Sequence, residues 1–508
     1  MSGSGNAADE PSSSPPAGRT LTKIIRKTEV QNTFATIFHA EFMDHYKLGE
    51  WNEEGAMKLL KTLKDMEAAK IKTVMYSVSW DWFAPNEQTL RWAYMNDIVN
   101  IIIDMLRSPG WLFRKHPDSR AVDSGGRSYS HMSWFHTAAN RLAIDMLRQL
   151  GEHMVKGFPG CVVAIQPVYN NEYEAKFTQE YDSFQDYNAH AQAAFRNWLR
   201  SRRQSLVEIN RRWGTGFRTW AELKPPPMMA GMLTGIEEHT RYWDWMRFRV
   251  EFGASVFNRA CAVVQNAGLK CYHHFPEFFS VLDAMYGASM FHRIAASKHT
   301  DFLIMDSNFM TPYRTVMNPV KLRIYVAAAH AYNKPVYFEA AVERFANFDL
   351  LKAGYKNAMM AGAPNMGLTN WLNRIELNAS LTQAMYTHPP CKVDELVGVF
   401  IHLDSCSAWT GLQQSSEVKD PLHNLVEDLA EKLTVNCTTD IAVYVELDRF
   451  TSDIEHFTRA VFVEPLFLYG SNELLSYAAA KMALKQLPHQ VLHLPAHQGF
   501  SLKVIEDL

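Results

Sequence analysis

Short apolar runs alternate with amphipathic segments along most of the chain. The runs that we predict to be strands in the first part are Phe34–His39, Thr73–Val78, Gly110–Phe113, Val162–Val168, Leu269–His273, Phe302–Met305, Val336–Phe338 and Gly367–Asn370. The segments between them with helical spacing are Glu53–Ala69, Met95–Leu106, Thr137–Lys156, Ser183–Arg202, Gly235–Asn266, Pro319–Tyr332 and Leu350–Ala361. Strands that alternate with helices are typical of parallel sheets. Eight such strands predict a (β/α)8 TIM barrel over residues 28–388, an α/β fold whose chemistry lies at the carboxyl ends of the strands.

The alternation starts again after the Pro389-Pro390 pair. Strands are predicted at Leu396–Ile401, Ile441–Val445, Ala460–Val463 and Gln490–Leu494, with helices near Pro421–Leu433 and Ser471–Leu487. This pattern predicts a second, smaller domain over residues 391–508, of the doubly wound, flavodoxin-like α/β class. No G-x-G-x-x-G motif opens it, so no nucleotide is expected there.

The first 27 residues form a Ser- and Pro-rich tail with few apolar side chains, which predicts disorder because little surface can be buried. The tail lacks the apolar run of a secretory signal, and no stretch of the chain reaches about 18 consecutive apolar residues. We therefore predict a cytoplasmic protein that does not bind a membrane.

Composition narrows the class further. The 508 residues include 51 Lys and Arg against 54 Asp and Glu, a net charge of −3 that is not typical of a nucleic-acid binder. The six cysteines lie far apart without a C-x-x-C pair, and the histidines are scattered, so we expect reduced, buried thiols, no metal and no cofactor. Aromatic residues make up 12%, enough to form a stacking surface for a ligand as well as a core.

Two glutamates follow predicted strands directly. The strand Val162–Val168 runs into Asn171 and Glu172, and the strand Val336–Phe338 runs into Glu339. In a barrel these would be strands four and seven, whose carboxyl ends can face each other across a ligand. A pair of carboxyl groups placed in this way can cleave a glycosidic bond, one as proton donor and the other as nucleophile or base. From the residues alone, a structural ion pair for either glutamate stays open, and Glu343 competes with Glu339.

The same strand-end rule selects further candidates for substrate binding. Trp80 ends strand two and Trp371 ends strand eight, where their rings could stack on a sugar. Asp306 and Asn308 follow strand six and could bind hydroxyl groups. His273 and His274 close strand five, and we take His273 as the candidate imidazole that faces the pocket, while a hydrogen-bonded structural role stays open.

Several motifs resemble those of one enzyme family. The run Val163–Tyr173, which ends in Asn-Glu-Tyr, resembles the acid/base region of glycoside hydrolase family 42, the β-galactosidases of clan A. Gly110-Trp111-Leu112 upstream and Trp213-Gly214-Thr215 downstream are similar to two more of its ordered motifs. The resemblance covers roughly residues 28–388, and the segment after residue 390 is similar to a shortened version of the family's trimer-forming domain. The segment 127–134 departs from the family because its sugar-contacting Arg and its Tyr-Cys-Pro element are not evident.

This resemblance implies a retaining exo-β-glycosidase that hydrolyses terminal β-galactosides by a two-carboxylate double displacement. It makes Glu172 the acid/base, Glu339 the nucleophile and Asn171 the ligand of the hydroxyl next to the reacting carbon. The implied partners are a carbohydrate substrate and, as in the family, other copies of the chain in a trimer. Two alternatives follow from the departure at residues 127–134: a catalytically silent barrel that binds carbohydrate or protein, and a β-glycosidase with another sugar preference.

Overall fold

The structure is a computed structural model of the 508-residue chain. It describes residues 37–40, 73–79, 100–106, 108–170, 175, 185–202, 204–227, 236–275, 290–306, 327, 329, 331–341, 353, 366–369, 395–402, 439–465, 467–486, 491–495 and 502–505. The predicted tail of residues 1–27 lies outside these ranges. Within them, none of the helices is both long enough and apolar enough to cross a membrane.

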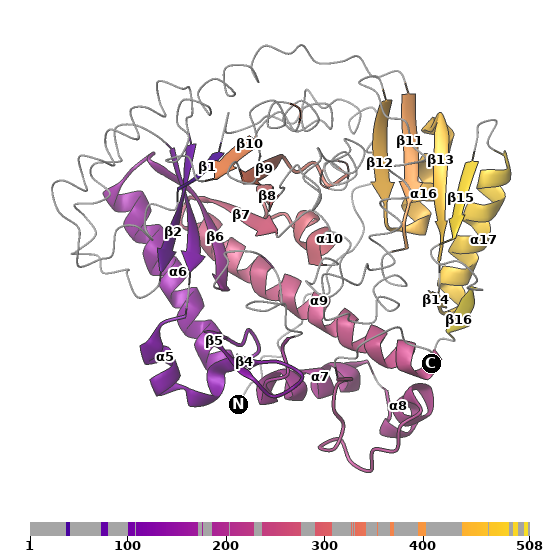
Figure 1. Cartoon of the computed structure of the whole chain (residues 1–508), viewed down its shortest axis with the longest axis horizontal. Helices are drawn as coiled ribbons and strands as arrows, with labels where there is room; N and C mark the ends of the chain where they lie inside the picture. The colour runs from indigo at the N-terminus through magenta and orange to yellow at the C-terminus, as the bar shows by residue number, and fades with distance from the viewer. Residues whose placement is uncertain are drawn as a thin grey trace, which may run out of the picture.

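Eight strands form a closed barrel in which every neighbouring pair is parallel (Figure 1). They are β1 (Ile37–Ala40), β2 (Thr73–Ser79), β3 (Asn100–Leu106), β6 (Val162–Asn170), β7 (Lys270–Phe275), β8 (Phe302–Asp306), β9 (Val336–Ala341) and β10 (Met366–Thr369). Their order around the barrel is β1-β10-β9-β8-β7-β6-β3-β2. The prediction of a parallel eight-stranded TIM barrel is confirmed.

The third strand of the barrel is not the one predicted. Residues 100–106, predicted as the end of a helix, form β3, and Gly110–Phe113, predicted as a strand, belongs to the short helix α5 (Gly110–Lys115). The run of three isoleucines, Ile101–Ile103, favours a strand because branched Cβ atoms restrict χ1 in a helix. Helix α5 follows Pro109, and its Leu112 and Phe113 are buried. Both predictions were wrong because a short apolar run fits either element.

Two long helices on the outside of the barrel agree with the sequence pattern. They are α6 (Thr137–Gly157) and α9 (Ile236–Asn266), and the shorter α10 (Met290–Ala295) packs beside α9. The predicted helix Glu53–Ala69 and most of Leu350–Ala361 and Pro319–Tyr332 lie outside the described residues.

Two long connections leave the carboxyl ends of neighbouring barrel strands. The connection from β3 to α6 holds α5, the 3-10 turn η4 (Pro117–Ser119) and an antiparallel hairpin of β4 (Arg120–Val122) and β5 (Ser128–Met132). The connection from β6 to α9 holds α7 (Ala189–Ser201) and α8 (Leu206–Trp213). Helix α7 starts later than the predicted Ser183 because the side chain of Asn188 caps it by accepting the N–H of His190.

The two faces of β7 show which side chains fill the barrel. Cys271 and His273 contact α9, so their face is the outer one. Alternation along a strand then places Tyr272 and His274 on the inner face. Tyr272 belongs to a buried apolar cluster across four neighbouring strands, which we call the inner cluster; its members are Ala164, Tyr272, Phe302, Ile304 and Tyr337.

A second sheet follows the barrel in the sequence. It is parallel, in the order β12-β11-β13-β15, and its strands are β11 (Glu395–Phe400), β12 (Thr439–Tyr444), β13 (Arg459–Glu464) and β15 (Val491–Pro495). Accompanying it are α16 (Leu447–Asp453), the 3-10 turn η8 (Ile454–His456), α17 (Ser471–Gln486) and a parallel pair, β14 (Phe467–Tyr469) with β16 (Lys503–Ile505).

Tight packing in this second unit explains one glycine. A Cβ at position 398 would lie 2.3 Å from the ring of Phe457, the residue after η8, which is too close for two carbon atoms. Position 398 of β11 therefore requires glycine. The second unit also contacts the first, because Trp243 of α9 stacks on Tyr469 of β14 with ring centroids 4.0 Å apart.

Candidate active site at the carboxyl ends of the barrel strands

Position 339 lies near the carboxyl end of β9. The backbone of Glu339 pairs with Asp306 of β8 on one side and with Gly367 of β10 on the other. Position 339 shares a face of β9 with position 337, and the ring of Tyr337 is fully buried in the inner cluster. Asp306 is the last residue of β8 and likewise shares a face with Ile304 of the inner cluster. The register therefore puts two acidic positions side by side at the level where a TIM barrel binds its substrate.

Strand β6 extends to Asn170, so it leads directly to the predicted Asn171 and Glu172. Those two residues lie outside the described residues, and so do Trp80, Asn308 and Trp371. The structure thus gives the backbone register of Glu339 and Asp306, and the roles of all seven residues stay predictions.

His273 does not face the interior of the barrel, which corrects the prediction for this residue. Its Nε2 lies 3.2 Å from Sγ of Cys261 and its ring packs on Phe257 with centroids 5.3 Å apart, both on α9. Burial lowers the pKa of His273 to about 3, so the imidazole is neutral. Of the two adjacent histidines, His274 has the inner position, because side chains alternate between the faces of a strand.

Cys261 and Cys271 form a disulfide between α9 and β7, with Cα atoms 5.3 Å apart. The expectation of reduced thiols is therefore wrong for this pair. The nine residues between them contain the end of a helix, a turn and the start of a strand, and the sequence does not show that this path returns the second cysteine to the first.

A polar side chain on the inner face was missed by the sequence reasoning. Gln166 of β6 is fully buried, shares a face with Ala164, and accepts the backbone N–H of His274 through its side-chain oxygen. The signal that could have found it is the single amide within the apolar run of β6. Its hydrogen bond ties β6 to β7 just before β6 reaches Asn171.

The two long connections are joined by a buried carboxylate. Oδ1 of Asp186 accepts the backbone N–H groups of Val122, at 3.0 Å, and of Asn188, at 2.9 Å. The backbone N–H of Tyr187 donates to the carbonyl of Val122 at 2.7 Å. Asp186 is buried, and this burial raises its pKa to about 6. These contacts fix the chain just after the segment 171–184 against the β4–β5 hairpin.

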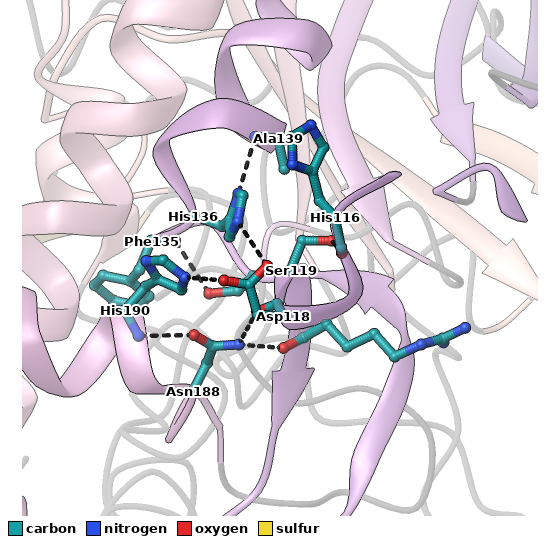
Figure 2. Close-up of polar contacts among 10 residues, drawn as sticks. His116, Asp118, Ser119, Phe135, His136, Ala139, Asn188 and His190 are labelled. Carbon is teal, nitrogen blue, oxygen red and sulfur yellow. Dashed lines mark hydrogen bonds and ion pairs between the residues drawn. The ribbon is translucent and has the colours of Figure 1, made fainter. Parts of the chain in front are cut away.

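A second polar group connects the same two segments near the surface (Figure 2). The carboxylate of Asp118 lies 3.3 Å from Nε2 of His136 and 2.8 Å from Nε2 of His190. Nδ2 of Asn188 donates to the carbonyl oxygens of Asp118, at 2.8 Å, and of Arg120, at 2.6 Å. We call Asp118, His136 and His190 the histidine joint.

Two groups within the described residues bring three potential metal ligands within 4.8 Å of one another. One is Cys261, Cys271 and His273, whose sulfur atoms already bond to each other. The other is the histidine joint, whose imidazole nitrogens hydrogen-bond to the carboxylate between them. Metal binding is thus not needed to account for either arrangement.

Comparison with known families decides the classification. A sequence model of the family described as beta-galactosidase, glycoside hydrolase family 42, matches residues 45–339, more than half of the chain. The chain belongs to glycoside hydrolase family 42.

Two curated relatives share about a quarter of the aligned residues with this chain. Beta-galactosidase BgaB of a Geobacillus species is 24% identical over 220 residues, which are 40% of this chain and 31% of that protein. The beta-galactosidase of Thermus thermophilus is 24% identical over 295 residues, 52% of this chain and 40% of that protein. The alignments therefore span less than half the length of these curated relatives.

Solved structures share the fold. The beta-galactosidase of the haloarchaeon Halorubrum lacusprofundi superimposes with a TM-score of 0.66 at 14% identity, covering 91% of this chain and 72% of that one. An exo-carrageenase of family 42 from Bacteroides ovatus has a TM-score of 0.57 at 10% identity, covering 85% and 66%. Such structures support a TIM barrel with an extra domain.

The family 42 motif Trp213-Gly214-Thr215 has a structural role in the described residues. Trp213 is buried, stacks on Phe195, and donates from Nε1 to Oδ2 of Asp244 on α9 at 2.8 Å. Gly214 ends α8 in the left-handed conformation, with a φ of 61°. The motif holds α8 against α9.

Proposed function

We propose that this chain is a retaining exo-β-glycosidase that hydrolyses terminal β-galactosides by a two-carboxylate double displacement. The observation that carries the proposal is the position of Glu339, on the inner face of β9 beside Asp306, at the end of the segment that matches family 42. The beta-galactosidase activity named for the relatives supports the same reaction.

In the proposed reaction, the carboxylate of Glu339 attacks the anomeric carbon while Glu172 protonates the leaving glycosidic oxygen. Glu172 then takes a proton from water, which attacks the glycosyl-enzyme and releases the sugar with its original anomeric configuration. Asn171 binds the hydroxyl next to the reacting carbon. For retention, the two carboxyl groups should lie about 5–5.5 Å apart.

Substrate contacts are proposed from the remaining strand ends. Asp306 and Asn308 bind sugar hydroxyl groups, and Trp80 and Trp371 supply stacking faces. His274 takes the role first given to His273, since it shares the inner face with Tyr272. A cytoplasmic location stays a prediction from the sequence.

Another sugar preference is the second candidate. The exo-carrageenase of Bacteroides ovatus shares the fold and the family, and its name shows that family 42 is not restricted to one substrate. The departure at residues 127–134 is compatible with this candidate. No comparison favours the catalytically silent barrel.

A panel of nitrophenyl glycosides tests the reaction and the sugar together. The full chain should release nitrophenol fastest from the β-galactoside, and Glu339→Gln and Glu172→Gln should each lower kcat at least about a thousandfold. Glu343→Gln is the matched control, since it removes a carboxylate four residues away and should keep activity. Faster hydrolysis of a β-glucoside, β-fucoside or α-arabinoside would establish the second candidate, and unchanged turnover in Glu339→Gln would refute the nucleophile.

We also propose that the chain divides near residue 390 and that residues 391–508 form a flavodoxin-like domain that associates copies of the chain, as in the family's trimers. The order β12-β11-β13-β15 supports this class, because the second strand in the sequence lies beside the first at one edge. Leu475 and Met482 on α17 are 68% and 61% exposed, which supports an apolar contact between copies. Light scattering should show a trimer for the parent chain and a monomer for the double variant Leu475→Lys/Met482→Lys. A monomeric parent chain would refute association.

A further inference from the structure

Helix α6 begins with an unusual cap. The residue before its first turn is His136, whose Nδ1 accepts the backbone N–H of Ala139 at 3.0 Å (Figure 2). Caps are ordinarily made by Ser, Thr, Asp or Asn, whose oxygen atoms stay acceptors over the physiological pH range. An imidazole nitrogen accepts only while it carries no proton.

The cap fixes the tautomer of His136. Because Nδ1 accepts a hydrogen bond, the proton of the neutral ring is on Nε2, the atom that lies 3.3 Å from Oδ1 of Asp118. The neutral ring thus satisfies both partners at once. A second proton would put an N–H on Nδ1 directly opposite the N–H of Ala139, and the cap hydrogen bond would be lost.

We propose that the histidine joint is a proton-operated latch: neutral His136 closes the first turn of α6 onto Asp118, and protonation of His136 opens that turn in mild acid. The inference does not depend on the proposed glycosidase activity. It goes beyond that activity because it assigns a conformational response to the segment that joins the two long connections.

The surroundings of His136 set the direction of the response. The ring is buried, and it faces Asp118 of η4, His190 of α7 and His116, whose ring centroid lies 5.4 Å away. Burial, and then the positive charge that His190 can carry, lower the pKa of His136 below its usual 6.5, although Asp118 opposes them. For a histidine with a lowered pKa, the stabilisation is complete above about pH 6.5 and is lost as the pH falls through the folded-state pKa.

The residues next to the cap connect the first turn of α6 to the apolar core. Trp134 and Phe135 immediately precede the cap, and they pack on Phe257 and Phe252 of α9 with ring centroids 4.7 and 4.2 Å apart. The first turn of α6 lies between these apolar contacts and Asp118. Loss of the cap therefore loosens the junction of α6 with η4 while the rest of α6 stays packed.

The same three residues could be taken for a metal site, but the cap argues against it. A cation at Nε2 of His136 needs the lone pair of the nitrogen that carries the proton in this structure. Metal-bound histidines usually donate from their other nitrogen, whereas Nδ1 here accepts. Zinc binding is therefore an outcome that would overturn the latch.

Hydrogen exchange of the peptide that contains Ala139 and Asn140 tests the latch in the full chain. The matched variant is His136→Ser, which keeps a cap oxygen but cannot be protonated. At about pH 7.5 the two proteins should exchange at the same rate, and at about pH 5 the parent should exchange about fivefold faster than the variant. His136→Ala should exchange faster than both at about pH 7.5. A parent-to-Ser ratio that does not change with pH would overturn the proposal.

Asp118→Asn gives a second readout that a purely structural role would not move. Asn keeps an acceptor for Nε2–H but removes the negative charge that favours protonated His136, so the acid-induced loosening should move to lower pH. Movement to higher pH contradicts the latch. Protection of the same peptide by equimolar Zn²⁺ in the parent, abolished by His190→Ala, would replace the latch with a metal site.

Discussion

The inner cluster of the barrel and the histidine joint are held together by different forces, although both lie within the family 42 segment. The inner cluster is apolar, fully buried and formed by side chains from four neighbouring strands. The joint is polar and partly exposed, since 64% of the Asp118 side chain and 38% of the His190 side chain are accessible to solvent. The strands that carry Glu339 and Asp306 are thus held together by apolar contacts, whose strength does not depend on pH. The polar contacts of the histidine joint do depend on pH.

The largest effect on this comparison should come from a cavity in the inner cluster. Phe302 is buried between Tyr272, on which it stacks at 4.9 Å, and Tyr337 at 5.5 Å. Phe302→Ala should lower the free energy of unfolding by about 3–5 kcal/mol, by the same amount from about pH 5 to pH 8. Urea denaturation measures it, with Phe302→Leu as the control that keeps more of the volume. A cost below about 1 kcal/mol would mean that the inner cluster does not form.

The second change acts on the outer face of the same barrel. Replacing both Cys261 and Cys271 by Ser should cost about 2–3 kcal/mol, because the disulfide closes a short loop of the unfolded chain. Treating the parent with a reductant under denaturing conditions should expose two more thiols than the unreduced protein shows. Equal thiol counts before and after reduction would show that the pair is reduced, as the sequence first indicated.

The smallest expected effect concerns the buried carboxylate that joins the connections. Burial raises the pKa of Asp186 to about 6, so the folded chain holds more protons than the unfolded chain between that value and 3.8. The contribution of Asp186 to the free energy of unfolding therefore increases as the pH falls from about 6 to about 3.8. Asp186→Asn keeps an oxygen for the N–H groups of Val122 and Asn188 but avoids the buried charge.

Asp186→Asn should therefore raise the melting temperature at about pH 7.5 and leave it unchanged at about pH 4. Thermal unfolding followed by circular dichroism measures both. A lower melting temperature of Asp186→Asn at about pH 7.5 would show that the attraction of Arg249 outweighs the cost of burying the charge.

The barrel was predictable from the sequence because its strands are apolar runs with local signatures. The exception, β3, shows the limit of this reasoning: an isoleucine run with polar neighbours fits a helix or a strand, and only pairing with β2 and β6 decides. Between His273 and His274, the sequence does not say which faces inward, because a one-residue change of register exchanges the two faces.

The joints between the connections were not predictable. Asp118 lies 72 residues before His190, and Asp186 lies 64 residues after Val122, so no local pattern brings them together. Short polar segments of this kind resemble ordinary loops. The cap at His136 was hidden for another reason: histidine is not among the residues that signal the start of a helix.

Covalent trapping of the nucleophile tests the central claim most directly. With a 2-deoxy-2-fluoro-β-galactoside, the nucleophilic carboxylate of a retaining enzyme should displace dinitrophenolate from the anomeric carbon and form a glycosyl ester, and the fluorine slows the hydrolysis of this ester. Peptide mass spectrometry should find one sugar per chain, on Glu339, and none in Glu339→Gln. An absence of any adduct in a protein that hydrolyses the nitrophenyl galactoside, or an adduct on Glu343, would contradict the assignment.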